Sequence, residues 1–162
     1  MSVNRYRPHL LILPEDDANR QLANGFLQNP SLNLRAVQVL PPSGGWAKVY
    51  SEFIESYITQ LRNNPLGHLV LLIDFDNQVE DRTRYFKDDF PDDVADRVYL
   101  LGTLEEPEPL RVSRGISLEK IGEALSSGCF EDDDQHWRHE LLQHNQAEVQ
   151  RLIANVKPFL FR

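Results

Sequence analysis

Two aspartates, Asp74 and Asp76, follow a run of five aliphatic residues, 69–73, near the middle of the chain. The run is too short to span a membrane, and its composition favours a buried β-strand. Side chains at positions i and i+2 of an extended strand point to the same side, so the two carboxylates would lie close together. Such carboxylates repel each other unless a cation lies between them, and Mg²⁺ is commonly held by one or two carboxylates. The alternative is an acidic strand end that leads into a polar turn.

Acidic residues also stand at the ends of other predicted strands. Glu15, with Asp16 and Asp17 beside it, follows the apolar segment 9–13, and a third acidic group that includes Glu108 follows the fourth strand. The carboxyl ends of parallel strands meet at one edge of a sheet, where α/β proteins bind their ligands. We therefore expect Glu15 to converge with the two aspartates of the central strand around Mg²⁺ or Mn²⁺. Asp16, Asp17 and Glu108 are candidates for further metal ligands.

Strand-like and helix-like segments alternate along the first two-thirds of the chain. Strands are predicted at 9–13, 34–40, 69–73 and 97–102, with helices between them at about 18–28, 46–63 and 80–90. This alternation predicts an α/β fold, in which a mostly parallel four-stranded sheet carries helices on both faces. We expect a single domain, 1–162, with its core at about 8–104 and a helical tail at about 105–162.

The tail differs in character from the core. Its first residues, 105–110, contain two prolines and are expected to be irregular. Ser117 is expected to cap a short helix, and a long helix is predicted over about 137–156, with Pro158 ending it. An acidic run before the long helix would offset its dipole. Three histidines on this helix are expected to face solvent or a partner rather than to bind a metal: His136, His139 and His144.

Composition narrows the classes of function. The chain has 162 residues, of which 41% are hydrophobic and 26% are charged, as in ordinary globular proteins. The net charge of −8 argues against a protein that coats nucleic acid non-specifically, but allows an enzyme that holds nucleic acid through metal ions or a basic partner. The single cysteine, Cys129, excludes an internal disulfide framework. The N-terminal residues lack the apolar run of a signal peptide, so we expect a cytoplasmic protein that does not enter a membrane.

A glutamate after the first strand and an Asp-x-Asp after the third are the pattern of the Toprim fold, which this chain resembles. Three segments carry the resemblance, 10–15, 44–49 and 71–77. The chain is most similar to compact Toprim-like proteins and to the Toprim half of overcoming-lysogenization-defect (OLD) nucleases, which work with ABC-type ATPases. The resemblance implies a Toprim-like (Rossmann-like) fold, a metal on the two aspartates, and Glu15 as general acid/base or metal ligand. Asp16 stands where the family has a glycine.

The first strand is also similar to the start of a response-regulator receiver domain. In that family an acidic pair on the first strand and an aspartate on the third bind Mg²⁺ and accept a phosphoryl group. Two departures weigh against this resemblance. The interval from Asp16 to Asp74 is long for a receiver, and the fourth strand region, 98–104, contains no lysine.

Residues suited to a phosphate precede and open the second predicted helix. The amides of Gly44 and Gly45 would be free to bind an anion at its N-terminus, and Lys48, one turn later, is the best placed cation. The alternative for Lys48 is an ordinary exposed lysine. The Lys-Ser/Thr of a P-loop is missing, so no nucleotide site is predicted here.

Two classes of function follow from these residues. The first is a Mg²⁺- or Mn²⁺-dependent phosphodiesterase or nuclease acting on DNA or RNA, with Asp74 and Asp76 holding the metal and Glu15 as ligand or as the base that activates water. The family resemblance implies an ATPase partner, in a defence system, and this partner would supply much of the affinity for nucleic acid. The second is a non-catalytic binding or regulatory subunit with a degenerate metal site. The oligomeric state, including a homo-oligomer, is left open.

Overall fold

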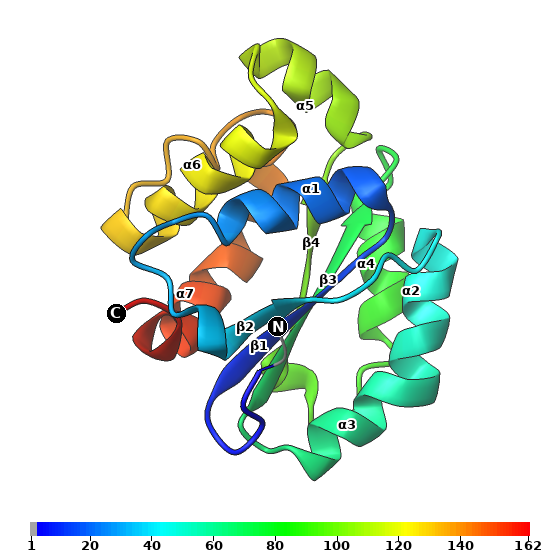
Figure 1. The fold of residues 1–162 in the computed structure, drawn as a ribbon. Helices are drawn as coiled ribbons and strands as arrows, with labels where there is room; N and C mark the ends of the chain where they lie inside the picture. Colours follow the sequence, from blue (N-terminus) through cyan, green and yellow to red (C-terminus); the bar gives the residue numbers. More distant parts are fainter. Residues whose placement is uncertain (1–2) are drawn as a thin grey trace.

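Four parallel strands form one sheet in the computed structural model, which describes residues 3–162 (Figure 1). The strands are β1 His9–Pro14, β2 Val37–Val39, β3 Gly67–Asp74 and β4 Val98–Thr103. They lie in the order β2-β1-β3-β4, and every neighbouring pair is parallel. The predicted α/β, Rossmann-like class is thereby confirmed. Because β1 and β3 are neighbours in the interior of the sheet, Glu15 and Asp74 leave it side by side.

Helices cover both faces of the sheet. They are α1 Asp17–Phe26, α2 Trp46–Glu52, α3 Ile58–Asn63, α4 Val79–Lys87, α5 Pro107–Arg114, α6 Leu118–Glu131 and α7 Gln146–Leu160. Figure 1 shows α2, α3 and α4 on one side of the sheet and α1, α6 and α7 on the other. The helix predicted over 46–63 is continuous, with one π-helical turn, Phe53–Tyr57, between α2 and α3. None of the helices in residues 3–162 has the length and apolar character needed to cross a bilayer.

The central strand β3 is buried on both faces, as predicted. Leu69, Leu71 and Ile73 are fully buried in the cluster that also contains residues of α2 and α4. Val70 lies in the opposite cluster, with residues of α1 and α7. The run of aliphatics therefore supplies both cores, which is why it shows no polar alternation.

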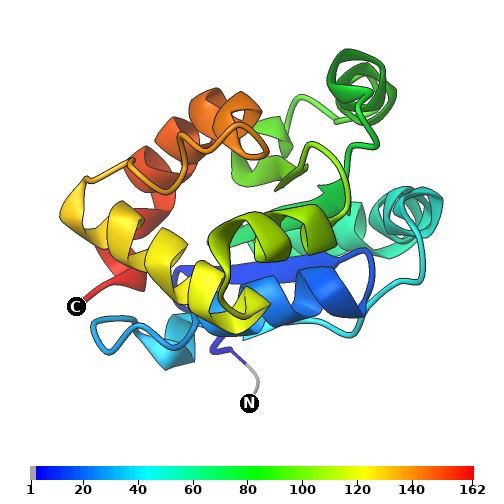
Figure 2. The ribbon, with the colours of Figure 1, turned by 90° about the horizontal axis from the view of Figure 1, so that it is seen from above.

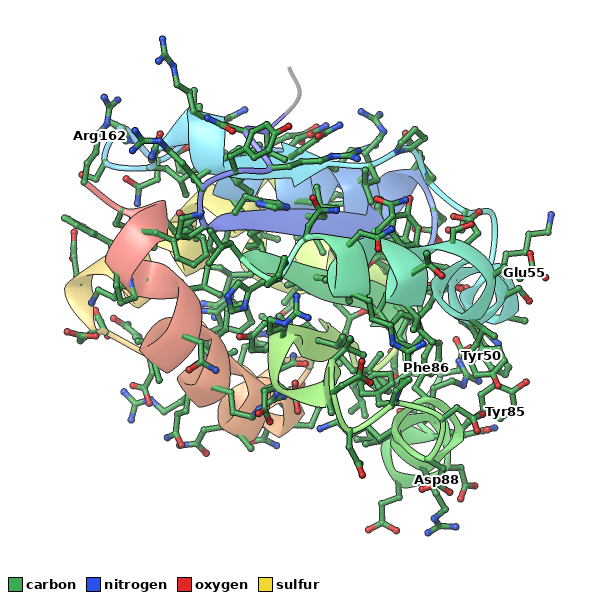
Figure 3. The ribbon with its side chains drawn as sticks, turned by 90° about the horizontal axis from the view of Figure 1, so that it is seen from below. Tyr50, Glu55, Tyr85, Phe86, Asp88 and Arg162 are labelled. Carbon is green, nitrogen blue, oxygen red and sulfur yellow. The ribbon has the colours of Figure 1, made fainter. Side chains whose placement is uncertain are left out.

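Helices α2 and α4 are fixed to each other by aromatic side chains. Tyr50, Tyr85 and Phe86 lie together between them (Figure 3), with ring centroids 4.8 Å apart for Tyr50 and Tyr85 and 5.7 Å apart for Tyr50 and Phe86. Such tilted contacts add to the burial of apolar area. Both helices begin at the carboxyl edge of the sheet, so this packing sets the position of the residues in their first turns.

Helix α1 is held by close contact with α6, which runs alongside it (Figure 2). Two glycines allow the approach. A Cβ at Gly25 would lie 2.0 Å from the carbonyl oxygen of Glu119, and one at Gly122 would lie 2.1 Å from that of Leu22. The two backbones are thus in direct contact, which no larger side chain would permit at these positions. This contact fixes α1, the helix whose N-cap is Asp16.

The outer edge of β4 is closed by side chains of the tail. Glu148 accepts a hydrogen bond from Leu100 N at 3.2 Å, and Asn145 bonds both Gly102 N at 3.1 Å and Gly102 O at 2.9 Å. Asn145 and Glu148 are buried by this contact. These bonds occupy the outward amides of Leu100 and Gly102, which another strand would otherwise need for pairing at this edge.

The tail differs from its prediction both in its first two segments and in its last helix. Segment 105–110 is not irregular, because Pro107 begins α5 and Pro109 lies in its first turn, where a missing N–H costs no helical hydrogen bond. The helix capped by Ser117 extends to Glu131 and ends at a left-handed residue, Asp132 with φ 56°.

The long helix predicted over 137–156 is also wrong in its bounds. Turns cover the region up to Leu142, and α7 begins only at Gln146, after a 3₁₀ turn at 143–145. Trp137 turns inward instead, where its Nε1 donates to the carbonyl of Leu125 at 3.1 Å. Pro158 does not end α7, because it lies in the last turn of the helix and removes only one hydrogen bond. Earlier in the chain, the predicted strand 34–40 is shortened by a 3₁₀ turn at 34–36.

Candidate metal centre at the carboxyl edge of the sheet

Glu15 and Asp16 lie where β1 leaves the sheet. The hydrogen-bond ladder with β3 continues one residue past β1, since Glu15 N donates to Leu72 O at 2.9 Å. Asp16 has an extended backbone and caps α1, because its carboxylate accepts a hydrogen bond from Asn19 N at 3.0 Å. The cap places the Asp16 carboxylate at the edge of the sheet.

Asp74 ends β3 directly beside Glu15. Its backbone N donates to Oε2 of Glu15 at 2.6 Å, which fixes one oxygen of that carboxylate and leaves Oε1 for another partner. The exposed fractions of Glu15 and Asp74 are only 8% and 5%. One ligand oxygen from each of Glu15, Asp16 and Asp74 lies within 4.8 Å of the others. The predicted convergence of Glu15 with Asp74 is confirmed.

Burial disfavours the charged forms of the carboxylates in this cluster. The pKa of Glu15 is raised from 4.5 to about 7, first by burial and then by the charges of Asp74, Asp16 and Asp76, while the hydrogen bond from the Asp74 backbone opposes the rise. The pKa of Asp74 is raised from 3.8 to about 6, again first by burial, and the hydrogen bond from Asn19 opposes this rise.

No basic side chain of the described residues pairs with these three carboxylates. Within residues 3–162, no lysine or arginine forms an ion pair with the carboxylate of Glu15, Asp16 or Asp74. Buried carboxylates without a cationic partner either take up protons or bind a cation. A divalent cation would favour the charged form of all three carboxylates.

Asp76 does not join this cluster, and the expectation that it would lie beside Asp74 on an extended backbone is wrong. The strand ends at Asp74, and Asp76 and Asn77 both have left-handed backbones, with φ of 49° and 62°. The Asp76 carboxylate accepts a hydrogen bond from Arg82 Nη1 at 3.1 Å. The side-chain alternation of a strand therefore stops before it reaches Asp76.

Arg82 holds the turn that carries Asp76. Its side chain is 8% exposed, and Nη1 also donates to the carbonyl oxygen of Asp74 at 2.9 Å. The guanidinium lies 4.0 Å from the centroid of the Trp46 ring, at the start of α2. Arg82 thus joins α4, α2 and the end of β3, and fixes the backbone on which Asp74 stands.

Asn19 is the site residue that sequence reasoning missed. It is fully buried, and its Nδ2 donates to Oδ1 of Asp16 at 2.9 Å and to Oδ1 of Asp74 at 2.8 Å. Its own Oδ1 has no hydrogen-bond partner in the described part of the chain. Its place in the first turn of α1 put it near the carboxyl edge of the sheet, but only the structure shows that it is buried against Asp74.

The loop before α2 does not present the free amides that were expected. The amides of Gly44 and Gly45 donate to the carbonyl oxygen of Glu15 at 2.8 and 3.1 Å, so they tie the loop to the end of β1. Lys48 is exposed and folds back over this loop, since its Nζ would lie 3.6 Å from a Cβ placed on Gly44. Lys48 takes part in no ion pair within residues 3–162 and stays the candidate for a phosphate contact.

Glu108 and the histidines lie outside the cluster. Glu108 is exposed on α5 and pairs with Arg111, which lowers its pKa, so its assignment as a metal ligand finds no support. The histidines do not share a helix. His139 bonds Ser113 Oγ at 3.0 Å, and His144 Nε2 bonds Gly102 O at 2.8 Å. Glu108 therefore adds no ligand, and the candidate site consists of the carboxylates after β1 and β3.

The donor set of the cluster fits a hard divalent cation. All its ligand atoms are carboxylate oxygens, which Mg²⁺ and Mn²⁺ prefer over the nitrogen and sulfur ligands typical of Zn²⁺. No lysine or arginine of residues 3–162 forms an ion pair with the three acids, so the described part of the chain does not balance their charges.

Comparison with known proteins identifies no relative of this chain. No family model, no curated protein and no solved structure matches the chain. The fold and the acidic cluster therefore define the class, which is an α/β protein with a parallel sheet and a candidate cation site at its carboxyl edge.

Proposed function

We propose that this protein is a divalent-cation-dependent phosphodiesterase that acts on nucleic acid. The observation that carries the proposal is the cluster of Glu15, Asp16 and Asp74, in which ligand oxygens from two adjacent strand ends lie within 4.8 Å of one another. The site lies at the edge of a parallel sheet where α/β proteins bind their ligands. The Toprim resemblance of the strand ends points to the same chemistry.

The three acids of the cluster have two roles in this proposal, cation binding and activation of water. A bound Mg²⁺ or Mn²⁺ would supply Lewis-acid polarisation of a phosphate oxygen. Asp16 and Asp74 hold the cation, and Asp16 replaces the Asp76 that the sequence predicted. Glu15 keeps Oε2 on the Asp74 amide and presents Oε1 either to the cation or to a water molecule, whose proton it accepts.

Few basic groups of this chain are placed to bind the substrate. Lys48, in the first turn of α2 and beside the Gly44–Gly45 loop that is tied to Glu15, would contact a non-bridging phosphate oxygen. With a net charge of −8, the chain has little long-range attraction for DNA or RNA. We therefore propose that a protein partner supplies much of the affinity, and the Toprim resemblance suggests an ABC-type ATPase.

The test combines thermal unfolding with cleavage. In the presence of millimolar Mg²⁺ or Mn²⁺ the melting temperature should rise, because a ligand that binds only the native state stabilises it. Single-stranded DNA, double-stranded DNA and RNA should be assayed for cleavage, with Asp74→Asn as the inactive control. A melting temperature that neither cation changes would refute the proposal. Cation binding without cleavage of any of these substrates would instead support a non-catalytic subunit.

A second candidate is a receiver-like phosphoacceptor. The observation that favours it is that the site unites an acidic pair after β1 with Asp74 after β3, while Asp76 stays apart. The absence of a lysine on β4 still weighs against it. Incubation with Mg²⁺ and acetyl phosphate decides this point, because a phosphoacceptor gains the mass of one phosphoryl group and its Asp74→Asn variant does not.

A further inference from the structure

Asn19 connects the two acids that come from different parts of the chain. The residue belongs to the first turn of α1, whereas Asp74 stands at the end of β3, 55 positions away. Both hydrogens of the Asn19 amide are used, one on Asp16 Oδ1 at 2.9 Å and one on Asp74 Oδ1 at 2.8 Å. The orientation of the amide follows from these contacts, because the reverse orientation would place its oxygen against two carboxylate oxygens.

The contact is not explained by helix capping. Asp16 already caps α1 through the backbone N of Asn19, and that bond needs no asparagine side chain. The side chain is fully buried, and its Oδ1 has no partner in the described part of the chain. An unpaired buried acceptor is unfavourable for stability. What the Asn19 side chain does instead is fix the orientation of two carboxylates.

We propose that Asn19 is the positioning residue of the cation site, an inference that rests on the proposed function. By binding Oδ1 of both aspartates, it turns Oδ2 of Asp16 and of Asp74 toward the cation. The neutral amide suits this role. A lysine at this position would supply the charge that the cation supplies, and an aspartate would add a further repelling carboxylate. Hydrogen bonds that orient metal ligands in this way are a general feature of metal sites.

The test measures Mn²⁺ affinity by titration calorimetry at a temperature at which each variant is fully folded by circular dichroism. Asn19→Ala removes both hydrogen bonds and leaves the backbone cap in place, so we expect Mn²⁺ binding to weaken by about 10–100-fold. Asn19→Ser offers one donor that reaches one carboxylate at a time, and should give an intermediate affinity. Asn145→Ala is the matched control, because Asn145 is also buried and hydrogen-bonded but contacts β4 instead of the acids.

The outcomes separate this inference from the proposed function. If Asn19→Ala binds Mn²⁺ as tightly as the parent, Asn19 is a structural residue and the inference is overturned. The same holds if Asn145→Ala weakens binding as much, because the effect would then be general loosening of the fold. If the parent itself binds no Mn²⁺, the proposed function fails. Should Asn19→Ala not fold, the comparison of Asn19→Ser with the parent decides in the same way.

Discussion

Replacing Glu15 by glutamine should stabilise the cation-free protein at alkaline pH and weaken its response to Mn²⁺. Glutamine keeps an oxygen that accepts the hydrogen bond from Asp74 N, but it carries no charge. The pKa of Glu15 is about 7 in the folded protein against 4.5 for an ordinary glutamate. Between these pH values the folded state therefore binds more protons than the unfolded chain. The stability that Glu15 contributes is fully present below pH 4.5 and is lost as the pH rises through 7.

The size of the effect follows from the same two values. The difference between 4.5 and about 7 corresponds to roughly 3 kcal/mol at pH 8, at about 1.36 kcal/mol per pH unit. Burying the glutamine amide costs on the order of 1 kcal/mol, which leaves a net gain of roughly 2 kcal/mol. For a chain of this size, that gain raises the melting temperature by about 4–8 °C. At pH 5 the charge term falls below about 1 kcal/mol, because Glu15 is then protonated in the folded parent.

The assay is thermal unfolding of the parent and Glu15→Gln at pH 5 and pH 8, each with a chelator and with millimolar Mn²⁺. With the chelator at pH 8 the variant should melt higher than the parent. With Mn²⁺ the parent should gain more than the variant, because the variant has lost one charged ligand. The control is Glu55→Gln, an exposed glutamate on the π-helical turn (Figure 3), which should change nothing at either pH. A variant that melts lower than the parent with the chelator at pH 8 would contradict the assignment of a buried, uncompensated carboxylate.

Four other changes test separate parts of the structure. Asp74→Asn should abolish the Mn²⁺-induced rise in melting temperature and any cleavage, without loss of stability in chelator; a marked destabilisation there would identify a purely structural acid. Arg82→Gln should lower the free energy of unfolding by about 2 kcal/mol, measured by urea denaturation, because the Asp74 carbonyl loses its charged donor and Trp46 its cation. Gly122→Ala should cost about 1–3 kcal/mol in the same measurement, since its Cβ would lie 2.1 Å from a carbonyl oxygen of α1; an unchanged midpoint would show that the two helices separate easily. Glu108→Gln should leave the calorimetric affinity for Mn²⁺ unchanged, because its exposed carboxylate pairs with an arginine of α5, and a loss of binding would return this residue to the site.

The sequence by itself determined the elements of the core and the edge at which the site lies. Five aliphatics in a row specify a strand buried on both faces, as β3 is. Ser117 was identifiable as an N-cap because such a side chain bonds a backbone amide only three residues away, here that of Lys120. The alternation of strands with helices required parallel pairing, so Glu15 and Asp74 had to meet at one edge. Each of these inferences depends on interactions that are short in sequence or on the topology that they impose.

Tertiary structure decided which acids share the site. Local spacing favoured Asp76, but Arg82 and the left-handed backbone after β3 draw its carboxylate away from the cluster. Asp16 is the third acid of the cluster because the start of α1 is held beside the end of β3. The hydrogen bond from Asn19 to Asp74, which lies 55 positions further along the chain, joins these two elements. The tail shows the same limit, since α7 begins where Asn145 and Glu148 meet the edge of β4. A contact between residues far apart in the chain, such as that of Asn19 with Asp74, leaves no periodic pattern in the sequence, so the third carboxylate of the cluster could not be assigned from the sequence.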